Sequence, residues 1–309
     1  MNFKLLLKGI IYTSFASFLW GIPQVLYFNK IKSIPALEII AHRAIWSFAI
    51  ILIITTVIGK FNEFKIIFLN LYKIIFLTIT SILISINWSL FILSISLNRV
   101  QDASMGYFIS PIISLGLGYI FFKEKLSFKQ KMSVLLMVFA IIYLLISLKV
   151  FPFIASLIGL SWACYGLLRK KVNVSAEIGL LFETGLISFF AFLYLGHLTI
   201  IGEIFFISKG IKITLLLLFT GFVTTLPLFF FNLGVKILPL GLTGIIFFLV
   251  PIFQFLTSII ILNEVINLNK IIGFTIIWIA VVFFIIDKLK QEYSLKQKKI
   301  NENNIQLPN

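Results

Sequence analysis

Apolar residues occur along this chain in ten long runs that are separated by mostly short polar connections. A helix that crosses a bilayer needs roughly 20 predominantly apolar residues, and each run is close to that length. Short connections favour antiparallel neighbours within a bundle. The ten runs cover residues 9–28, 35–58, 74–97, 102–122, 129–148, 151–169, 175–197, 213–235, 240–262 and 269–287. The pattern predicts an all-α integral membrane protein with ten transmembrane helices.

One of these runs has a counterpart 140 residues further along the chain. Pro111 is followed by Glu124 after 13 residues, and Pro251 is followed by Glu264 after the same interval. Because the chain contains only eight prolines and eleven acidic residues, this shared spacing inside two apolar runs indicates two related halves. Each half would hold five helices, an odd number, so the second half would enter the membrane from the opposite side as an inverted repeat.

The distribution of Lys and Arg sets the expected orientation. If the N-terminus is cytoplasmic, 18 of the 26 Lys and Arg residues fall on the cytoplasmic side and 7 outside, as the positive-inside rule expects. The sequence therefore predicts cytoplasmic N- and C-termini. The expected regions are a first five-helix repeat over residues 1–148, a second over residues 149–287 and a polar, Lys-rich cytoplasmic tail over residues 288–309.

Composition narrows the functional classes. The chain is 60% hydrophobic and 12% charged, which is more apolar surface than a soluble fold of 309 residues could bury. A net charge of +15 would suggest nucleic acid in a soluble protein, but membrane orientation explains it here, and no nucleic-acid partner is expected. The single cysteine excludes an internal disulfide, and the sequence has no phosphate-binding loop, Rossmann glycine pattern or zinc-protease helix. We therefore expect no cofactor, no metal site and no catalytic residue.

The informative charges are those that lipid would reject. Arg43 lies well inside the second run, where an arginine costs at least ~2.5 kcal/mol even on lenient scales, and Glu183 occupies the matching position of the second half. Helix rise places their backbones at depths that differ by ~10 Å, so direct pairing is left open. Two interpretations remain: static contacts that satisfy the charges, or a transport cavity in which one or both bind substrate or exchange a proton.

Other candidate residues lie close to these charges in the expected bundle. Glu38 and His42 are four residues apart and share a helix face; we expect Glu38 to be solvated near the interface, and His42 to serve in packing or as a proton relay. Six residues at similar expected depths carry polar groups or flat aromatic rings that either pack against neighbours or contact a ligand. They are Trp20, Asn87, Trp88, Tyr107, Trp162 and Tyr165. A proline inside a helix leaves an upstream backbone carbonyl without its usual hydrogen-bond partner. Such prolines either form passive kinks or surround a shared cavity. Four lie inside expected helices, and they are Pro23, Pro111, Pro227 and Pro251.

Several short motifs match a known family. The most specific are A-H-R-x-x-W-S from Ala41 and G-Y-F-I-x-P ending at Pro111, with weaker matches around Asn87, Tyr165 and Glu183. Over residues 9–287 the chain resembles the EamA type of the drug/metabolite transporter superfamily, and within it the RarD branch. The resemblance implies a multi-pass permease of the bacterial inner membrane, often labelled a drug or chloramphenicol-resistance permease. The matching positions are Glu38, His42, Arg43, Trp46, Asn87, Trp88, Tyr107, Pro111, Tyr165, Arg169, Glu183 and Pro251.

These observations favour a secondary transporter of small organic molecules such as drugs, amino acids or related metabolites, working by alternating access. Arg43 would attract an anionic group, and the aromatic residues would hold apolar or planar parts. Coupling to protons would need a carboxylate that changes protonation, and Glu183 is the candidate. The alternatives are a membrane-embedded lipid or isoprenoid enzyme, which would need clustered acids or a metal at one face, and a non-enzymatic helper protein, which would not need buried charge in both halves. The oligomeric state stays open.

Overall fold

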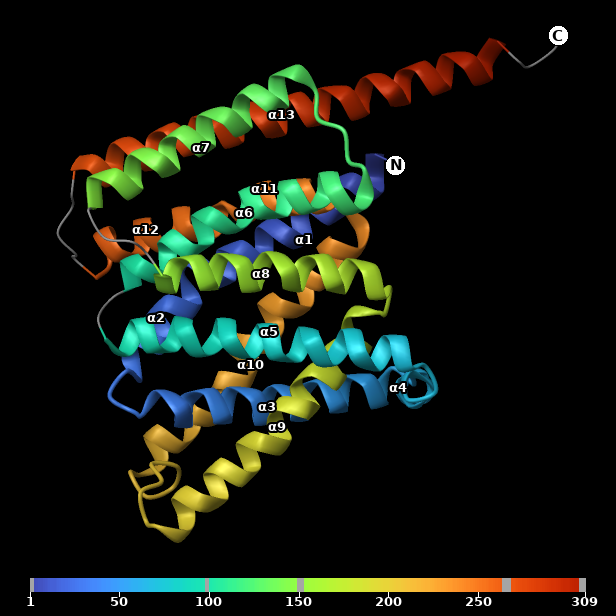
Figure 1. Ribbon diagram of the computed structural model, residues 1–309. Helices are drawn as coiled ribbons and strands as arrows, with labels where there is room; N and C mark the ends of the chain where they lie inside the picture. Colours follow the sequence, from blue (N-terminus) through green and yellow to red (C-terminus); the bar gives the residue numbers. More distant parts are fainter. Residues whose placement is uncertain (1–2, 98–99, 149–152, 263–267, 306–309) are drawn as a thin grey trace.

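The computed structural model describes residues 3–97, 100–148, 153–262 and 268–305, and within these ranges the regular secondary structure is entirely helical. The helices lie side by side in stacked layers, with α7 and α13 together at one edge of the bundle and α9 at the other (Figure 1). The elements are α1 (Phe3–Gly21), α2 (Pro23–Lys30), α3 (Ala36–Val57), α4 (Phe61–Ile67), α5 (Leu71–Ser96), α6 (Val100–Phe122), α7 (Phe128–Leu148), α8 (Phe153–Val172), α9 (Ala176–Ile200), α10 (Ile211–Ile237), α11 (Leu240–Phe247), α12 (Leu249–Ile260) and α13 (Leu268–Ile305).

Within the described ranges, nine segments are long and apolar enough to cross a membrane. They coincide with nine of the ten expected runs. The remaining run, residues 151–169, coincides with α8, a helix of 20 residues that packs against both α5 and α6. Three cations, Arg169, Lys170 and Lys171, occupy its last turn and lower its apolar content. The fold is therefore an all-helical membrane bundle.

Two of the spanning segments are broken near the middle of the bundle. The first consists of α1 and α2, which meet at Ile22, and another consists of α11 and α12, which meet at Phe248. Pro23 begins α2, where its lack of an amide hydrogen is tolerated at a helix start. The body of α12 contacts the first break, because the Thr257 hydroxyl donates a hydrogen bond to the carbonyl oxygen of Gly21 at 3.1 Å.

Close helix contacts depend on glycine at the crossing of α6 and α8. A Cβ atom built on Gly106 would lie 2.6 Å from the carbonyl oxygen of Ala155, and one built on Gly159 would lie 2.8 Å from that of Gly106. Small residues at such crossings let two backbones approach closely inside a membrane. This contact fixes α8 against α6 and so positions the aromatic side chains that α8 carries.

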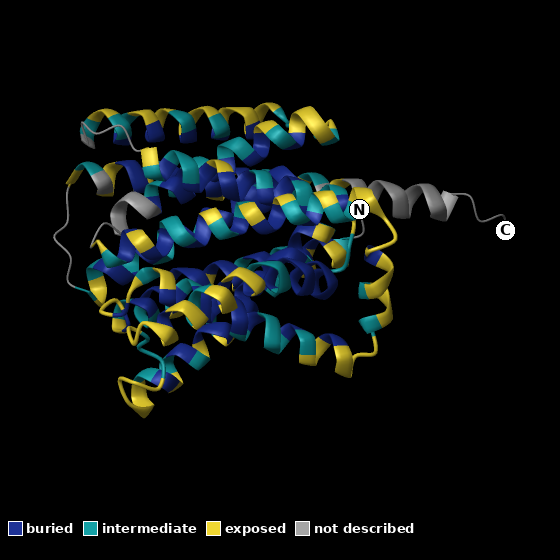
Figure 2. Ribbon diagram, turned by 60° about the horizontal axis from the view of Figure 1, so that its bottom comes forward, coloured by how far each residue is buried: buried dark blue, intermediate teal, exposed yellow. Residues whose placement is uncertain are grey.

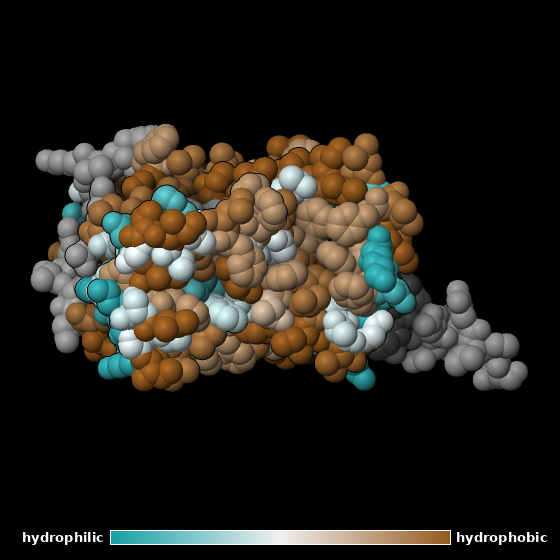
Figure 3. Space-filling model, turned by 90° about the horizontal axis from the view of Figure 1, so that it is seen from below, coloured by the Kyte–Doolittle hydropathy of each residue, from teal (hydrophilic) through white to brown (hydrophobic). Residues whose placement is uncertain are grey.

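The surface is apolar over most of its area. Buried residues fill the middle of the bundle and exposed ones lie on its outer faces (Figure 2). The face seen from below in Figure 3 is mostly hydrophobic, with hydrophilic residues gathered toward the two ends of the helices. The start of α1 and the end of α13 lie at the same end of the bundle (Figure 1). The expected polar tail is not separate from the last span, because α13 continues as one helix to Ile305.

Candidate functional site

Arg43 lies in the core, on the face of α3 that meets α2, α5 and α10. Only 1% of the residue is exposed. Its guanidinium carbon lies 4.4 Å from the centre of the Trp88 ring and 5.0 Å from that of Phe28, and its Nε donates to Thr224 Oγ1 at 3.2 Å. Its Nη1 atom has no hydrogen-bond partner among the described residues. Because a buried cation is costly unless it is paired, this guanidinium is suited to an anionic ligand.

Both helix breaks open onto a small chamber beside Arg43. Gln24 follows the first break and Gln254 the second; the Oε1 atom of Gln254 has no partner within the described part of the chain. The Tyr107 hydroxyl donates to Asn87 Oδ1 at 3.4 Å, and the Asn87 amide donates to the Ile158 carbonyl at 3.1 Å. The volume is about 20 Å³, enough for one water molecule. The lining residues are Trp20, Gln24, Arg43, Asn87, Trp88, Phe91, Tyr107, Trp162, Phe247, Val250 and Gln254.

Aromatic rings form the chamber wall that faces α8 and α11. The Trp20 and Trp162 rings meet edge to face with centroids 5.0 Å apart, and Trp162 stacks on Phe247 at 5.1 Å with an interplanar angle of 25°. Such rings offer flat apolar surfaces and a negative face for cations. The chamber therefore combines one incompletely satisfied cation, three primary amides and a group of stacked rings.

Glu183 lies in a second buried cluster, formed by α5, α8, α9 and α10. Its residue is 0% exposed, and its carboxylate accepts hydrogen bonds from the Thr80 hydroxyl at 2.6 Å and the Tyr165 hydroxyl at 3.1 Å. Arg169 Nε lies 3.6 Å from Glu183 Oε1 and donates to Asn232 Oδ1 at 2.7 Å. The Asn232 amide in turn donates to the Tyr165 hydroxyl at 2.9 Å. Each member of this cluster thus contacts another, while the Nη1 atom of Arg169 has no hydrogen-bond partner among the described residues.

Glu183 therefore pairs with Arg169, and no contact with Arg43 is formed. The two clusters meet through one stack, because the Trp162 ring of the chamber lies 5.4 Å from the Tyr165 ring with an interplanar angle of 27°. The sequence placed Arg43 and Glu183 at matching positions of two halves, which says nothing about which neighbour each would reach. Arg169 is the last residue of one of the expected apolar runs, and the structure places it in the core.

The comparison with known proteins identifies the family. The sequence model of the EamA-like transporter family matches residues 7–146 and 152–286. The chain belongs to this family. It is 32% identical over 289 residues to Protein RarD of Escherichia coli K12, covering 94% of this chain and 97% of that protein. It is also 34% identical over 296 residues to the uncharacterized transporter YojE of Bacillus subtilis, covering 94% and 97% respectively.

Other relatives agree on the class. The chloramphenicol-sensitive protein RarD of Pseudomonas aeruginosa is 23% identical over 260 residues, covering 82% of this chain and 86% of that protein. A solved structure, described only as the crystal structure of a protein, has a TM-score of 0.66 at 13% identity, and the match covers 89% of this chain and 97% of that one. The EamA-like fold is therefore shared with a solved protein. The chain is a RarD-like membrane transporter, a multi-pass protein of the bacterial inner membrane.

Most of the site residues predicted from the sequence lie in two places in this EamA-like protein, the chamber beside Arg43 and the cluster around Glu183. The chamber holds Trp20, Arg43, Asn87, Trp88, Tyr107 and Trp162, and the second cluster holds Tyr165 and Glu183. His42 belongs to neither. Its Nδ1 accepts a hydrogen bond from Trp46 Nε1 at 3.1 Å, and its Nε2 lies 3.8 Å from Glu38.

Glu38 differs from its expected solvated position, because the residue is 0% exposed. One carboxylate oxygen accepts hydrogen bonds from the backbone amides of Phe205 and Phe206, at 2.8 and 3.0 Å. These amides lie in the connection between α9 and α10, which folds over the start of α3. This connection shields the Glu38 carboxylate from the water expected near the membrane interface. Two backbone amides donate the hydrogen bonds that water would otherwise supply.

Glu124 caps a helix of the other half. Its two carboxylate oxygens accept hydrogen bonds from the backbone amides of Leu240 at 2.6 Å and Gly241 at 2.9 Å, at the start of α11. Amides at a helix start lack partners within the helix and favour a negative charge. The carboxylate therefore stabilises the short helix α11 and its junction with α6. Its counterpart in the repeat, Glu264, lies outside the described residues.

The four prolines differ in position. Pro111 and Pro227 lie inside α6 and α10, whereas Pro23 begins α2 and Pro251 is the third residue of α12. Only the latter two therefore accompany the helix breaks that line the chamber.

Some residues of the candidate site have only weak signals in the sequence. Gln254 follows Pro251 by three residues and is a polar residue in an apolar run, which is the signal that could have identified it. Thr80, Thr224 and Asn232 are ordinary polar residues of apolar helices, and only their contacts single them out.

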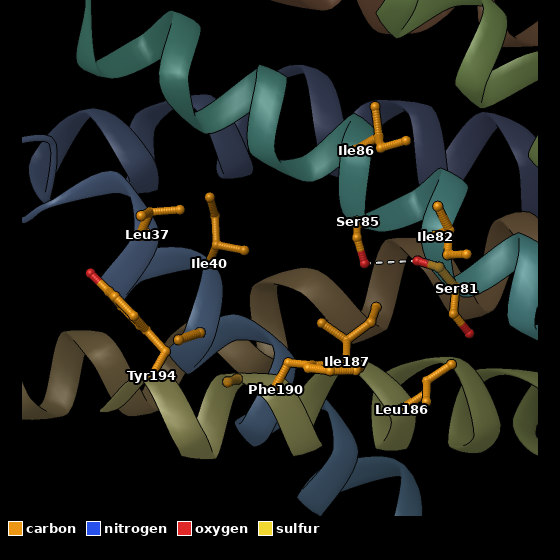
Figure 4. Close-up of a pocket in the computed structure, with 12 residues that line it drawn as sticks. Leu37, Ile40, Ser81, Ile82, Ser85, Ile86, Leu186, Ile187, Phe190 and Tyr194 are labelled. Atoms are coloured by element: carbon orange, nitrogen blue, oxygen red, sulfur yellow. Dashed lines mark hydrogen bonds between the residues drawn. The ribbon is translucent and has the colours of Figure 1, made fainter. Parts of the chain in front are cut away.

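A larger cavity lies elsewhere, between α3, α5 and α9, and shares no lining residue with the chamber. Figure 4 shows this groove, about 380 Å³, with Leu186 near one end and Tyr194 near the other. Its hydroxyls on α5 are already bound, because Ser81 donates to the Leu77 carbonyl and Ser85 to the Ser81 carbonyl, both at 2.7 Å. The groove is lined by apolar residues of three membrane-spanning helices, so hydrocarbon chains are its expected occupants. The smaller polar chamber is therefore the better candidate for a solute site.

Proposed function

We propose that this EamA-like transporter is a secondary transporter of small organic molecules that carry an anionic group and an apolar or planar part. The observation that carries this proposal is the buried guanidinium of Arg43, whose Nη1 has no partner among the described residues and which borders a chamber with amides and aromatic rings. A carboxylate would complete the hydrogen bonds of Arg43. Ring faces from Trp20, Trp88 and Trp162 would hold the rest of the molecule.

The transport cycle that we propose is alternating access. The chamber of about 20 Å³ holds one water molecule, so an organic substrate requires its walls to part. The observed arrangement corresponds to a closed state of the site. A cavity that is closed in one state and open to either face in others is what alternating access requires.

Paired helix contacts support the proposed inverted repeat. If α1 corresponds to α8, α3 to α9, α5 to α10, α6 to α11 and α12, and α7 to α13, each of the most extensive contacts has a counterpart. For example, the packing of α3 on α10 matches that of α9 on α5. The packing of α1 on α10 matches that of α8 on α5, and the packing of α6 on α8 matches that of α1 on α11 and α12. The remaining pairs, α3 with α9, α6 with α11 and α7 with α13, join corresponding helices. The two matches of the family model, one in each half, agree with this correspondence.

We further propose that Glu183 couples transport to proton movement. In this state its carboxylate has donors from Thr80 and Tyr165 and a cation in Arg169. A change of state that separates Arg169 from Glu183 would leave a carboxylate in the bilayer core, where taking up a proton removes the cost of the charge.

The proposal is tested by transport in proteoliposomes under an imposed pH gradient, with a panel of organic acids and zwitterions. Replacing Arg43 with Gln should reduce transport about 100-fold, because the loss of a buried charged contact typically costs binding 2–5 kcal/mol. Glu183→Gln should abolish the dependence on the pH gradient while leaving exchange of substrate between the two faces. Ile142→Leu, an exposed position on α7, is the matched control. Unaltered transport by both site variants would refute the assignment.

A further inference from the structure

A second small cavity adjoins the chamber. It lies among α6, α8, α10 and α11, toward the end of the bundle where α11 begins. Two residues, Trp162 and Phe247, line both cavities and therefore form the partition between them. The rest of its lining includes three hydroxyl side chains, those of Ser110, Ser114 and Thr243.

The partition is a packed aromatic layer. The rings of Trp162 and Phe247 are stacked 5.1 Å apart, and the residues are 5% and 2% exposed. Trp20, which lines the chamber, packs against the Trp162 ring with a centroid distance of 5.0 Å. Phe231, which lines the second cavity, packs against the same ring at 4.7 Å. The side chains that separate the two cavities are therefore aromatic rings. A polar solute can therefore cross only when the two rings separate.

The second cavity contains a hydroxyl without a hydrogen-bond partner. Ser110 is 1% exposed, and its Oγ has no partner within the described part of the chain. Ser114 and Thr243 add two further hydroxyls to the lining, the latter donating to the Pro239 carbonyl at 3.0 Å. A buried polar group left unpaired is destabilising, which points to a ligand or water that hydrogen-bonds there.

We propose that Trp162 and Phe247 form a gate between the Arg43 chamber and a second, transient substrate site at Ser110, Ser114 and Thr243. This rests on the proposed transport function. The second site offers hydroxyls and no cation, so it binds the polar end of the same organic anion more weakly than Arg43 does. Weaker binding beyond the gate lets the substrate leave toward that end of the bundle.

The gate has a physical connection to Glu183. The Trp162 ring also stacks on Tyr165, and the Tyr165 hydroxyl donates to the Glu183 carboxylate at 3.1 Å. A rearrangement of the Arg169 and Glu183 pair therefore shifts the ring that supports Trp162. This connection gives the proposed proton step a route to the gate.

The experiment measures access to the second cavity directly. In a Cys164→Ser background, Ser110→Cys reports on the second cavity and Gln254→Cys, in a separate protein, reports on the chamber. A small membrane-impermeant methanethiosulfonate is applied to vesicles from the face that carries the α2–α3 connection, opposite the second cavity. We expect Phe247→Ala and Trp162→Ala to raise the labelling rate of Ser110→Cys about tenfold, while that of Gln254→Cys changes less than about twofold.

Two further variants keep the result interpretable. Phe91→Ala removes a ring that lines only the chamber and should leave the labelling of Ser110→Cys unchanged. Trp162→Phe keeps a stacked ring and should also leave it unchanged. The gate is refuted if neither alanine variant accelerates labelling, or if Phe91→Ala accelerates it equally. The labelling experiment does not depend on transport. If the alanine variants accelerate labelling as expected but Arg43 variants transport normally, the gate stands and the proposed substrate site at Arg43 is refuted.

Discussion

The two buried arginines of the core differ in whether a carboxylate lies beside them. Arg169 has a carboxylate 3.6 Å away and an amide oxygen at 2.7 Å, within a cluster of polar side chains from four helices, although its Nη1 also has no hydrogen-bond partner among the described residues. Arg43 has one hydroxyl at 3.2 Å and two aromatic faces, and its Nη1 is without a hydrogen-bond partner among the residues described. A buried cation that a carboxylate of the protein neutralises stabilises one arrangement of helices, whereas a buried cation that only a hydroxyl and ring faces contact is suited to an anionic ligand.

The sharpest test of this comparison is the same substitution at both arginines. Arg169→Met should lower the free energy of unfolding by ~3–5 kcal/mol, because it leaves the Glu183 carboxylate buried without its cation. Arg43→Met should change it by less than ~1 kcal/mol, since no buried carboxylate loses a partner. Thermal and denaturant unfolding in the same detergent measures both. Equal destabilisation by the two variants would remove the distinction between a structural and a ligand-binding arginine.

A glycine in the second cluster provides a smaller perturbation. A Cβ on Gly179 would lie 1.5 Å from Arg169 Nη1, so Gly179→Ala must displace the guanidinium from its place beside Glu183. We expect a loss of ~1–3 kcal/mol in unfolding free energy, the usual cost of overpacking. Gly116→Ala is the control, because nothing lies within 4 Å of its added Cβ. A Gly179→Ala protein as stable as the control would show that the Arg169 position is not restricted.

The amides of the two regions extend the comparison. Asn232→Leu should destabilise the fold by ~1–3 kcal/mol, because Arg169 and Tyr165 both lose a buried partner. Gln254→Leu should be neutral within ~0.5 kcal/mol, since the Gln254 Oε1 accepts no hydrogen bond from the described residues, yet it should weaken transport. Unfolding and proteoliposome uptake are measured on the same preparations. A destabilised Gln254→Leu with normal uptake would place this amide among the structural residues.

The smallest effect is expected at an ion pair on the edge of the bundle. The hydrogen bond to Glu177, in the first turn of α9, holds the pKa of Lys60 above its ordinary value of 10.5. A raised folded-state pKa means that the stabilisation is present at neutral pH and is lost as pH rises above the ordinary value. Lys60→Met should therefore cost at most ~1 kcal/mol at pH 7, a modest figure because the ammonium is partly exposed. Unfolding measured at pH 7 and again above about pH 11 should show the difference from wild type shrinking.

The helical architecture could be predicted largely from the apolar runs. Nine of the ten expected runs coincide with spanning segments, and the tenth coincides with α8. The reason is that a bilayer imposes a length and an apolar composition that can be counted along the chain. The helix breaks were harder to place, because Pro111 and Pro227 lie in continuous helices while Pro23 and Pro251 accompany interruptions. Which proline interrupts a helix depends on what neighbouring helices offer to the freed backbone groups.

The candidate site was predicted residue by residue but not as contacts. Arg43, Trp88 and Tyr107 could be selected because lipid would reject them or because their rings are amphipathic. Their grouping into a chamber, apart from Glu183, required the packing of α5 and α8. Glu38 shows the same limit, because its burial depends on a connection 167 residues away in the chain.

Sequence alone determined that this chain crosses a membrane many times, that it contains related halves, and that a few costly charges must be kept from lipid. These follow from composition and spacing, which act locally on each helix. Only the tertiary structure decided which partner each charge has. It paired Glu183 with Arg169, left Arg43 facing a closed chamber, and placed Trp162 and Phe247 between two cavities. Such pairings depend on which helices lie side by side, and many arrangements of the same helices satisfy lipid equally well.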